Sequence, residues 1–230
     1  MTPSATGAVG DPLGIEHRPR LRGWIHVASF VLFLLAMPIL FVRSPSTGAT
    51  IALSVYAISI LSLFGVSALF HRVRWGEVGR RRMRRLDHST IFFAIAGSYT
   101  AVAGLCLMGT TRISILLLVW LGGLAGVVVR QVWLDAPKWV IAIPYIVVGW
   151  SALIVLPQLV HSLGGWGFAW LMAGGAAYTA GAVAYSAKAP NPVPGVFGYH
   201  EVFHAGTFLG ASCHYVVILF FALPIATRLG

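Results

Sequence analysis

The sequence predicts an all-α integral membrane protein, a bundle of seven transmembrane helices. Of its 230 residues, 58% are apolar and 10% are charged, whereas an ordinary soluble domain has about 25% charged residues. The net charge of +10 comes from 16 Lys and Arg against 6 Asp and Glu, and these charges flank long apolar runs, as they do beside membrane spans. This pattern excludes a soluble domain, a disordered chain and a nucleic-acid-binding protein.

The uncharged intervals are long enough to cross a hydrocarbon core, which takes roughly 20 apolar residues per helix. The stretch from Trp139 to Ala187 is too long for one helix, and Pro157 with Gly164 and Gly165 predicts a turn that divides it. A six-helix alternative stays open because Ile113–Val129 is the shortest span. The expected spans are Trp24–Val42, Ile51–His71, Ser89–Gly109, Ile113–Val129, Trp139–Val160, Trp166–Ala187 and Tyr199–Ala222.

Positive charge predicts the orientation, because cytoplasmic loops are richer in Lys and Arg. We therefore expect residues 1–23 to form a cytoplasmic tail, residues 24–230 to form a single domain in the inner (plasma) membrane, and the C-terminus to lie outside. The alternative interpretation of the arginine cluster at 72–85 is a nucleic-acid or partner-binding patch rather than a topological anchor. The expected inner side carries Arg18, Arg20, Arg22, the arginines of 72–85, Arg130, Lys138 and Lys188, and the outer side Arg43, Arg112 and Arg228.

Four ionisable residues at span ends are the candidates for chemistry, because such groups are expensive at membrane depth and mark functional sites. His71 ends the second span, Asp87 opens the third, and His200 and His204 open the seventh. The alternating direction of the helices puts all four near the cytoplasmic boundary. They are therefore expected to converge although they lie far apart in the chain.

His200 and His204 are four residues apart, which leaves both imidazoles on one helix face. With His71 they make a three-histidine set, the ligand type of catalytic zinc sites that keep an open position for water. Asp87 is expected to hold or deprotonate that water, and Ser67, one turn before His71, to touch the water or a substrate carbonyl. The alternative interpretation is a proton-relay or packing network. Nitrogen ligands favour zinc without excluding iron, copper or nickel.

Other polar residues are expected to have lesser roles. His214 lies about 15 Å farther along the helix than His204 and should bond within the bundle, and Glu201 is expected at the interface. His26 is a spare candidate ligand, and His88 faces away from Asp87. Neither of the two cysteines, Cys106 and Cys213, has the spacing of a disulfide framework or a thiolate metal site.

Three segments carry a resemblance to a known family: SALFH (67–71), RRLDHSTIFFAIAGSYT (84–100) and HEVFHAGTFLGASCHY (200–215). They resemble the bacterial hemolysin III family, which belongs with the progestin and adiponectin receptor superfamily and is distantly similar to alkaline ceramidases. The resemblance implies a zinc ion held by His71, His200 and His204, with Asp87 near the zinc-bound water and Ser67 behind it. Ala101 stands where the family has a proline, so no proline kink is expected in the third helix.

Three functions follow as hypotheses. The first is a zinc-dependent hydrolase of a lipid amide or ester, with Asp87 as general base and then acid and Ser67 helping to hold the oxyanion. The second is a structural zinc ion in a sensor or regulator of membrane state, without turnover. The third, a lytic or pore-forming protein, ranks last because the apolar spans lack polar stripes. Membrane lipids are the expected partners, and the sequence leaves the oligomeric state open.

Overall fold

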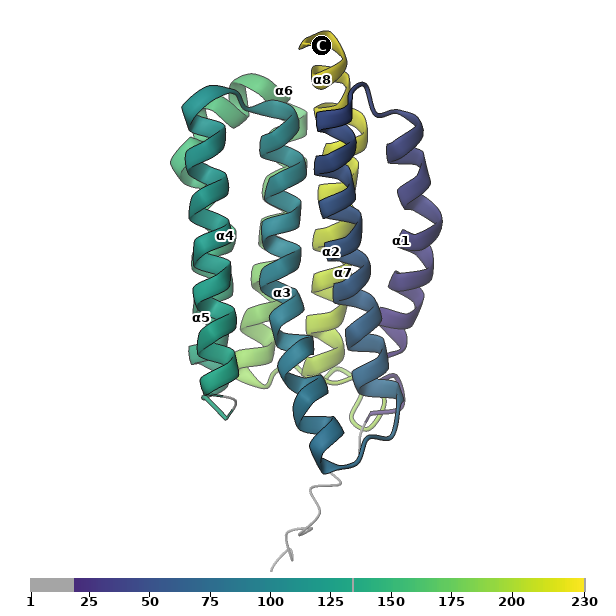
Figure 1. Cartoon of the computed structure of the whole chain (residues 1–230). Helices are drawn as coiled ribbons and strands as arrows, with labels where there is room; N and C mark the ends of the chain where they lie inside the picture. Colours follow the sequence, from purple (N-terminus) through teal and green to yellow (C-terminus); the bar gives the residue numbers. More distant parts are fainter. Residues whose placement is uncertain (1–18, 134, 230) are drawn as a thin grey trace, which may run out of the picture.

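The computed structural model describes residues 19–133 and 135–229, and nearly all of the secondary structure in this part of the chain is helical. Arg18 and most of the expected N-terminal tail lie outside the described residues. The helices form one upright bundle (Figure 1). The elements are α1 (Trp24–Val42), α2 (Thr47–Arg72), α3 (Glu77–Cys106), α4 (Gly109–Val132), α5 (Lys138–Gly149), the 3₁₀ helix η1 (Trp150–Val155), α6 (Leu156–Ala187), α7 (Tyr199–Val217), the π-helix η2 (Ile218–Ala222) and α8 (Leu223–Leu229).

Six helical segments of the described chain are long and apolar enough to cross a membrane. The first matches the expected span, Trp24–Val42. The shortest expected span lies inside the 24-residue α4, which is one of these six segments. The fifth segment, Ala142–Ala187, has 46 residues. It begins and ends near the lower end of the bundle in Figure 1, so the chain reverses direction within it.

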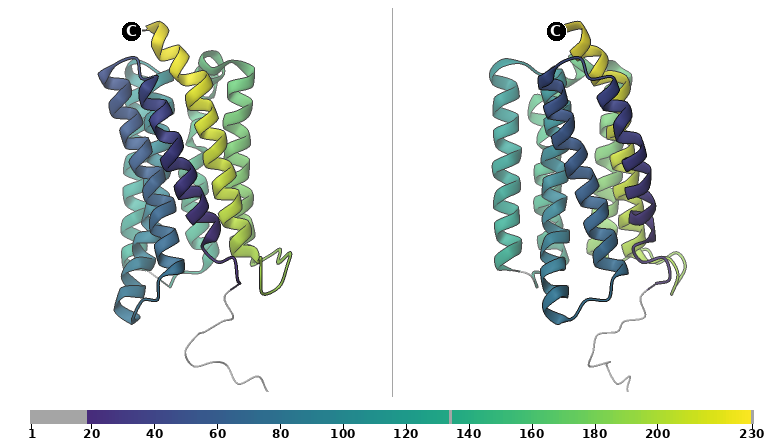
Figure 2. Two further views of the ribbon diagram at one scale, coloured as in Figure 1. Left: turned by 90° about the vertical axis from the view of Figure 1, so that its right-hand side faces the viewer. Right: turned by 45° about the vertical axis from the view of Figure 1, so that its right-hand side comes forward.

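The reversal coincides with Gly164 and Gly165 of the predicted turn, whereas Pro157, the third residue expected in that turn, lies in the first turn of α6. Gly164 has φ 66° and ψ 176°, a non-helical backbone inside α6, and positive φ is a conformation that glycine adopts without a Cβ penalty. Two helices therefore meet at Gly164, and the second of them descends to the loop before α7 (Figure 2).

The third helix corrects the sequence prediction. It begins at Glu77 rather than near Ser89 and continues unbroken past Ala101 to Cys106. Arginine, methionine and leucine are good helix formers, so the arginine-rich segment extends the helix beyond the apolar region instead of forming a loop. Asp87 consequently lies inside α3 and does not open it.

Small residues bring the helices close together around α3. A Cβ atom at Gly97 would collide with Ser59 of α2, and one at Gly126 of α4 would collide with the ring of Phe92. Lipid tails remove the hydrophobic driving force for association between helices, so helices in a membrane associate through close packing of this kind.

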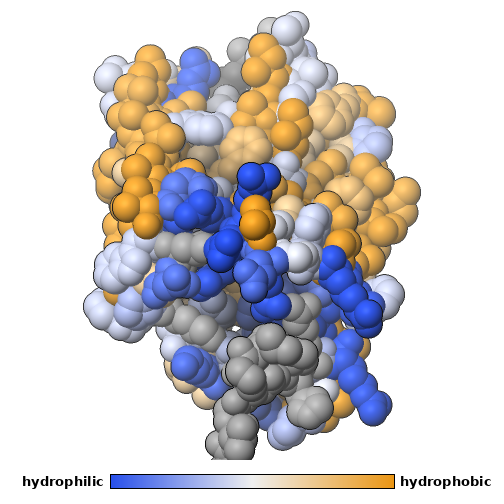
Figure 3. Space-filling view, turned by 60° about the horizontal axis from the view of Figure 1, so that its bottom comes forward, coloured by the Kyte–Doolittle hydropathy of each residue, from blue (hydrophilic) through white to orange (hydrophobic). Residues whose placement is uncertain are grey.

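The bundle has an apolar flank and a polar end. Large apolar side chains remain exposed, among them Leu35, Leu121 and Trp166, as expected of a surface that faces lipid. Figure 3, with the lower end of Figure 1 turned forward, shows hydrophilic residues gathered at that end and hydrophobic residues on the flanks. We call this the basic end, because it holds Arg20, Arg22 and the arginines of 72–85.

Candidate metal centre

Three histidines from two helices come together near the basic end of the bundle. His71 lies in the last turn of α2, and His200 and His204 lie in the first turns of α7. One ligand nitrogen from each falls within 4.8 Å of the others, and the Nε2 atoms of His71 and His200 are 3.2 Å apart. The expected convergence of these three residues is thus confirmed.

This geometry fits a metal ion. Zinc binds imidazole nitrogen at about 2.0–2.1 Å in a tetrahedral arrangement, which separates two ligand nitrogens by about 3.3 Å. The pair formed by His71 and His200 has that spacing, and a ligand nitrogen of His204 lies within 4.8 Å of both. Imidazole nitrogens alone make up the group, a donor set that suits zinc and several other transition metals.

His26 of α1 lies against this group but is not placed to be a fourth ligand. Its ring stacks on that of His204, with centroids 3.7 Å apart and planes 10° from parallel. A ligand nitrogen points at its metal in the plane of its ring, so an ion bound by His204 would lie outside the plane of His26. Both ring nitrogens of His26 lack a hydrogen-bond partner among the described residues, and its side chain is buried.

Asp87 and Ser67 lie together across the interface of α2 and α3. The Ser67 hydroxyl is within side-chain hydrogen-bonding reach of the Asp87 carboxyl group, and Ser67 is buried one turn before His71. Asp87 does not belong to the histidine group itself. His88, the next residue, directs Nδ1 to the carbonyl oxygen of Arg84 at 2.7 Å.

Glu201 has a role that the sequence analysis missed. It was expected at the interface, but its side chain is fully buried. One carboxylate oxygen contacts Nε of Arg22 at 2.5 Å, and the other accepts the backbone N–H of Gly198 at 2.9 Å. The sequence contained one usable signal, an acidic residue in the first turn of a helix, where it can accept free backbone N–H groups.

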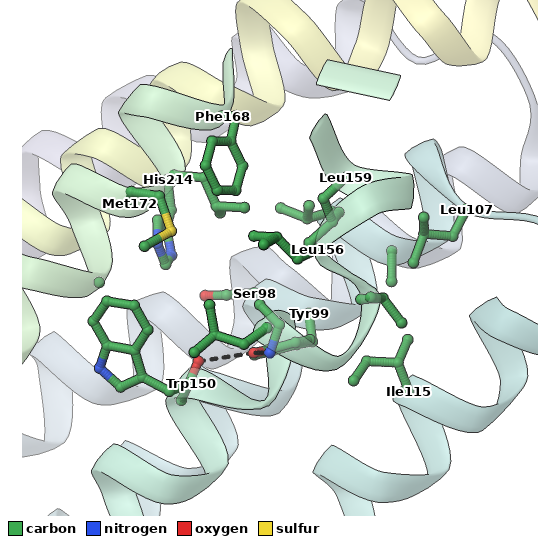
Figure 4. Close-up of a pocket in the computed structure, with 18 residues that line it drawn as sticks. Ser98, Tyr99, Leu107, Ile115, Trp150, Leu156, Leu159, Phe168, Met172 and His214 are labelled. Carbon is green, nitrogen blue, oxygen red and sulfur yellow. Dashed lines mark hydrogen bonds between the residues drawn. The ribbon is translucent and has the colours of Figure 1, made fainter. Parts of the chain in front are cut away.

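Two apolar cavities lie deeper in the bundle and share lining residues, among them Ser98, Tyr99 and His214. Figure 4 shows one of them, with His214 at its wall beside Met172 and Phe168. The other cavity is lined by Phe203 and Thr207, on either side of His204 in the sequence. His214 itself stands apart from the three-histidine group, as expected.

Comparison with known proteins gives consistent matches over most of the chain. The family described as "Haemolysin-III related" matches residues 15–215. Hemolysin-3 of Bacillus cereus is 28% identical over 206 residues, covering 88% of this chain and 90% of the relative. The Hemolysin-3 homolog of Bacillus subtilis (strain 168) is 26% identical over 203 residues, covering 87% and 92%. The human Monocyte to macrophage differentiation factor is 25% identical over 168 residues, covering 71% and 67%.

Proposed function

The chain belongs to the haemolysin-III related family, and on that premise we propose that it is a zinc-dependent membrane hydrolase of a lipid amide or ester. The observation that carries the proposal is the meeting of His71, His200 and His204 at one end of the bundle. These residues would hold the ion. Zinc bound there would supply Lewis acidity and a water activated at neutral pH.

The proposed orientation puts the basic end in the cytoplasm, with seven crossings of the inner (plasma) membrane. Ala142–Ala187 has 46 residues, more than twice the roughly 20 that one crossing takes, and its interruption at Gly164 supports two crossings. The gathering of arginine at the basic end supports the cytoplasmic assignment by the positive-inside rule.

Asp87 is the proposed general base and acid. Its carboxylate would take the proton from the attacking water and return it to the leaving amine or alcohol. Because the Ser67 hydroxyl is within hydrogen-bonding reach of the Asp87 carboxyl group, Ser67 would orient the carboxylate so that its free oxygen can receive the proton.

A lipid is the proposed substrate because of what surrounds the site. The apolar flank of the bundle would face lipid, and a cavity with apolar walls is lined by Phe203 and Thr207, which flank His204 in the sequence. Pockets of this kind bury an apolar ligand while a few polar groups orient it. A scissile amide or ester at headgroup depth could then reach the histidine group while its chain lies in apolar surroundings.

The structural alternative has one observation in its favour. The histidine group joins α2 to α7, and a bound ion would tie these two helices together without any turnover. The protein would then be a sensor or regulator of membrane state. The pore interpretation gains no support from the cavities, because apolar side chains dominate their walls.

Two measurements on detergent-purified protein test the proposal. Elemental analysis should find about one zinc ion per chain, as in sites with three protein ligands. A panel of lipid amides and esters should then be hydrolysed by the zinc-loaded protein and not after chelation. Zinc without hydrolysis of any lipid would favour the structural alternative, and protein without bound metal would contradict both.

A further inference from the structure

We propose that the segment Arg20–His26, which leads into α1 and includes its first turn (the lead-in), positions the metal centre together with Glu201 of α7. Arg22, His26 and Glu201 are the positioning residues. The inference rests on the proposed function, because it concerns the same three histidines. It goes beyond them in assigning to the start of α1 and to Glu201 a part in setting the geometry of the ligands on α2 and α7.

Glu201 connects the lead-in to the helix that carries two ligands. It follows His200 directly, its side chain is fully buried, and it pairs with Arg22, whose own side chain is only 19% exposed. The second carboxylate oxygen accepts the N–H of Gly198, the residue before α7. A single carboxylate thus fixes both the start of α7 and the position of Arg22.

The lead-in is also held by backbone hydrogen bonds to the loop that precedes α7. The N–H of Arg20 donates to the carbonyl of Gly195 at 3.0 Å, and that of Leu21 donates to the carbonyl of Val196 at 3.2 Å. Three points of attachment, two from the backbone and one from an ion pair, therefore join residues 20–22 to the N-terminal side of the helix that carries His200 and His204.

The same segment packs on the third ligand. Gly23 has φ 83°, and a Cβ atom placed on it would lie 2.7 Å from Cβ of His71. A side chain at position 23 would therefore push His71 away, in addition to straining the backbone. Beside this contact, the guanidinium of Arg72 lies over the ring of Trp24, 4.4 Å from its centroid, which holds the end of α2 against the start of α1.

His26 completes the arrangement by stacking on His204. His26 in turn packs against the ring of Phe64 in α2, with the two centroids 5.1 Å apart and the planes 75° from parallel. A ligand ring clamped on its face keeps its orientation, and preset ligands bind a metal more tightly because less freedom is lost on binding.

The charges in this region support the same assignment. Arg22 pairs with Glu201, the residue that follows His200, so its positive charge lies in the neighbourhood of the proposed ion and would repel it. The fully buried carboxylate of Glu201 balances that charge while remaining outside the ligand group. Removal of either partner would leave a buried charge unpaired next to the centre.

The test compares metal binding by full-length variants in detergent. We would measure zinc affinity by competition with a chromophoric chelator, and ligand geometry from the visible absorption of the cobalt-substituted protein. In Glu201→Gln one of the two accepting oxygens becomes an NH2 donor, so the contact with either Arg22 or Gly198 is lost. In Arg22→Gln the bond to Gly198 stays intact. Each variant should weaken zinc binding by about tenfold and change the cobalt spectrum, and Arg22→Lys should recover part of the loss.

The matched control is Asp135→Asn, which removes the carboxylate of another arginine pair at the same end of the bundle. Asp135 is exposed and pairs with Arg84 at 2.8 Å, so both readouts should match the wild type. The inference is overturned if Glu201→Gln and Arg22→Gln keep the zinc affinity within about twofold and leave the cobalt spectrum unchanged. If Glu201→Gln does not fold, Arg22→Gln decides. A wild-type protein that binds no metal would overturn the proposed function as well.

Discussion

Two parts of α7 use histidine in different ways. At the start of the helix, His200 and His204 meet His71 of α2, and His26 of α1 stacks on the group. Ten residues after His204, His214 packs in apolar surroundings, with the ring of Tyr178 at 5.4 Å and Gly174 against its edge. The spacing of residues on one helix can put two nitrogen ligands on the same face, as it does for His200 and His204. A metal centre also needs a ligand from another helix, which here is His71 of α2.

The largest expected effect is on metal content, which should depend on the histidines at the start of α7 and not on His214. His204→Ala should reduce bound zinc from about one ion per chain to background, because it leaves two protein ligands where a catalytic zinc site has three. His214→Ala should retain the full content. Elemental analysis of the two variants beside the wild type checks this, and equal metal in both would contradict the assignment of His204.

The next effect separates metal binding from catalysis. Asp87→Asn should keep zinc but lower hydrolysis of a lipid substrate by about 10²–10⁴-fold, the usual contribution of a general base. Turnover is measured under conditions where the wild type is saturated with zinc. Asp135→Asn, which also removes a carboxylate at the basic end, should be as active as the wild type. Unchanged turnover in Asp87→Asn would remove Asp87 from the mechanism.

Metal binding should also stabilise the fold, and only through the three-histidine group at the start of α7. Free zinc at about a thousand times its dissociation constant should raise the free energy of unfolding by about 4 kcal/mol. Thermal unfolding in detergent, with and without zinc, measures this. The increase should vanish in His71→Ala and persist in His214→Ala, and a zinc effect that survives in His71→Ala would mean that the ion binds elsewhere.

The smallest effect concerns packing around His214. A Cβ atom at Gly174 would lie 2.5 Å from Cδ2 of His214, whereas one at Gly175 would meet nothing nearer than 3.7 Å. Gly174→Ala should therefore destabilise the protein by about 1–3 kcal/mol, the cost of overpacking. Gly175→Ala is the matched control and should be neutral. Both variants should bind zinc normally, and equal melting temperatures would show that the ring of His214 moves aside freely.

Much of the architecture follows from local pattern. The span Trp24–Val42 was predicted with its bounds as observed, since apolar length between charges is what a membrane helix requires. The break at Gly164 followed from a glycine pair in a stretch too long for one helix. The start of α3 was misplaced, because a run of arginine interrupts the apolar pattern without interrupting the helix.

The candidate site was likewise predicted only in part from the sequence. Sequence alone singled out His71, His200, His204, Asp87 and Ser67, because ionisable and hydroxyl groups are conspicuous in so apolar a chain. It misjudged Glu201, which has the appearance of an ordinary interfacial acid, and it counted His26 among possible ligands. Burial, ion pairing and ring stacking corrected both assignments.

The sequence by itself determined that this protein is a bundle of apolar helices with histidines of metal-binding spacing at one end, because length and helical period are properties of neighbouring residues. Only the tertiary structure decided that Arg22 meets Glu201, that His26 stacks on His204 and that Ser67 lies beside Asp87. These contacts depend on the relative height and rotation of helices that are far apart in the chain. Side-chain packing between the helices determines that register, and no local periodicity contains it.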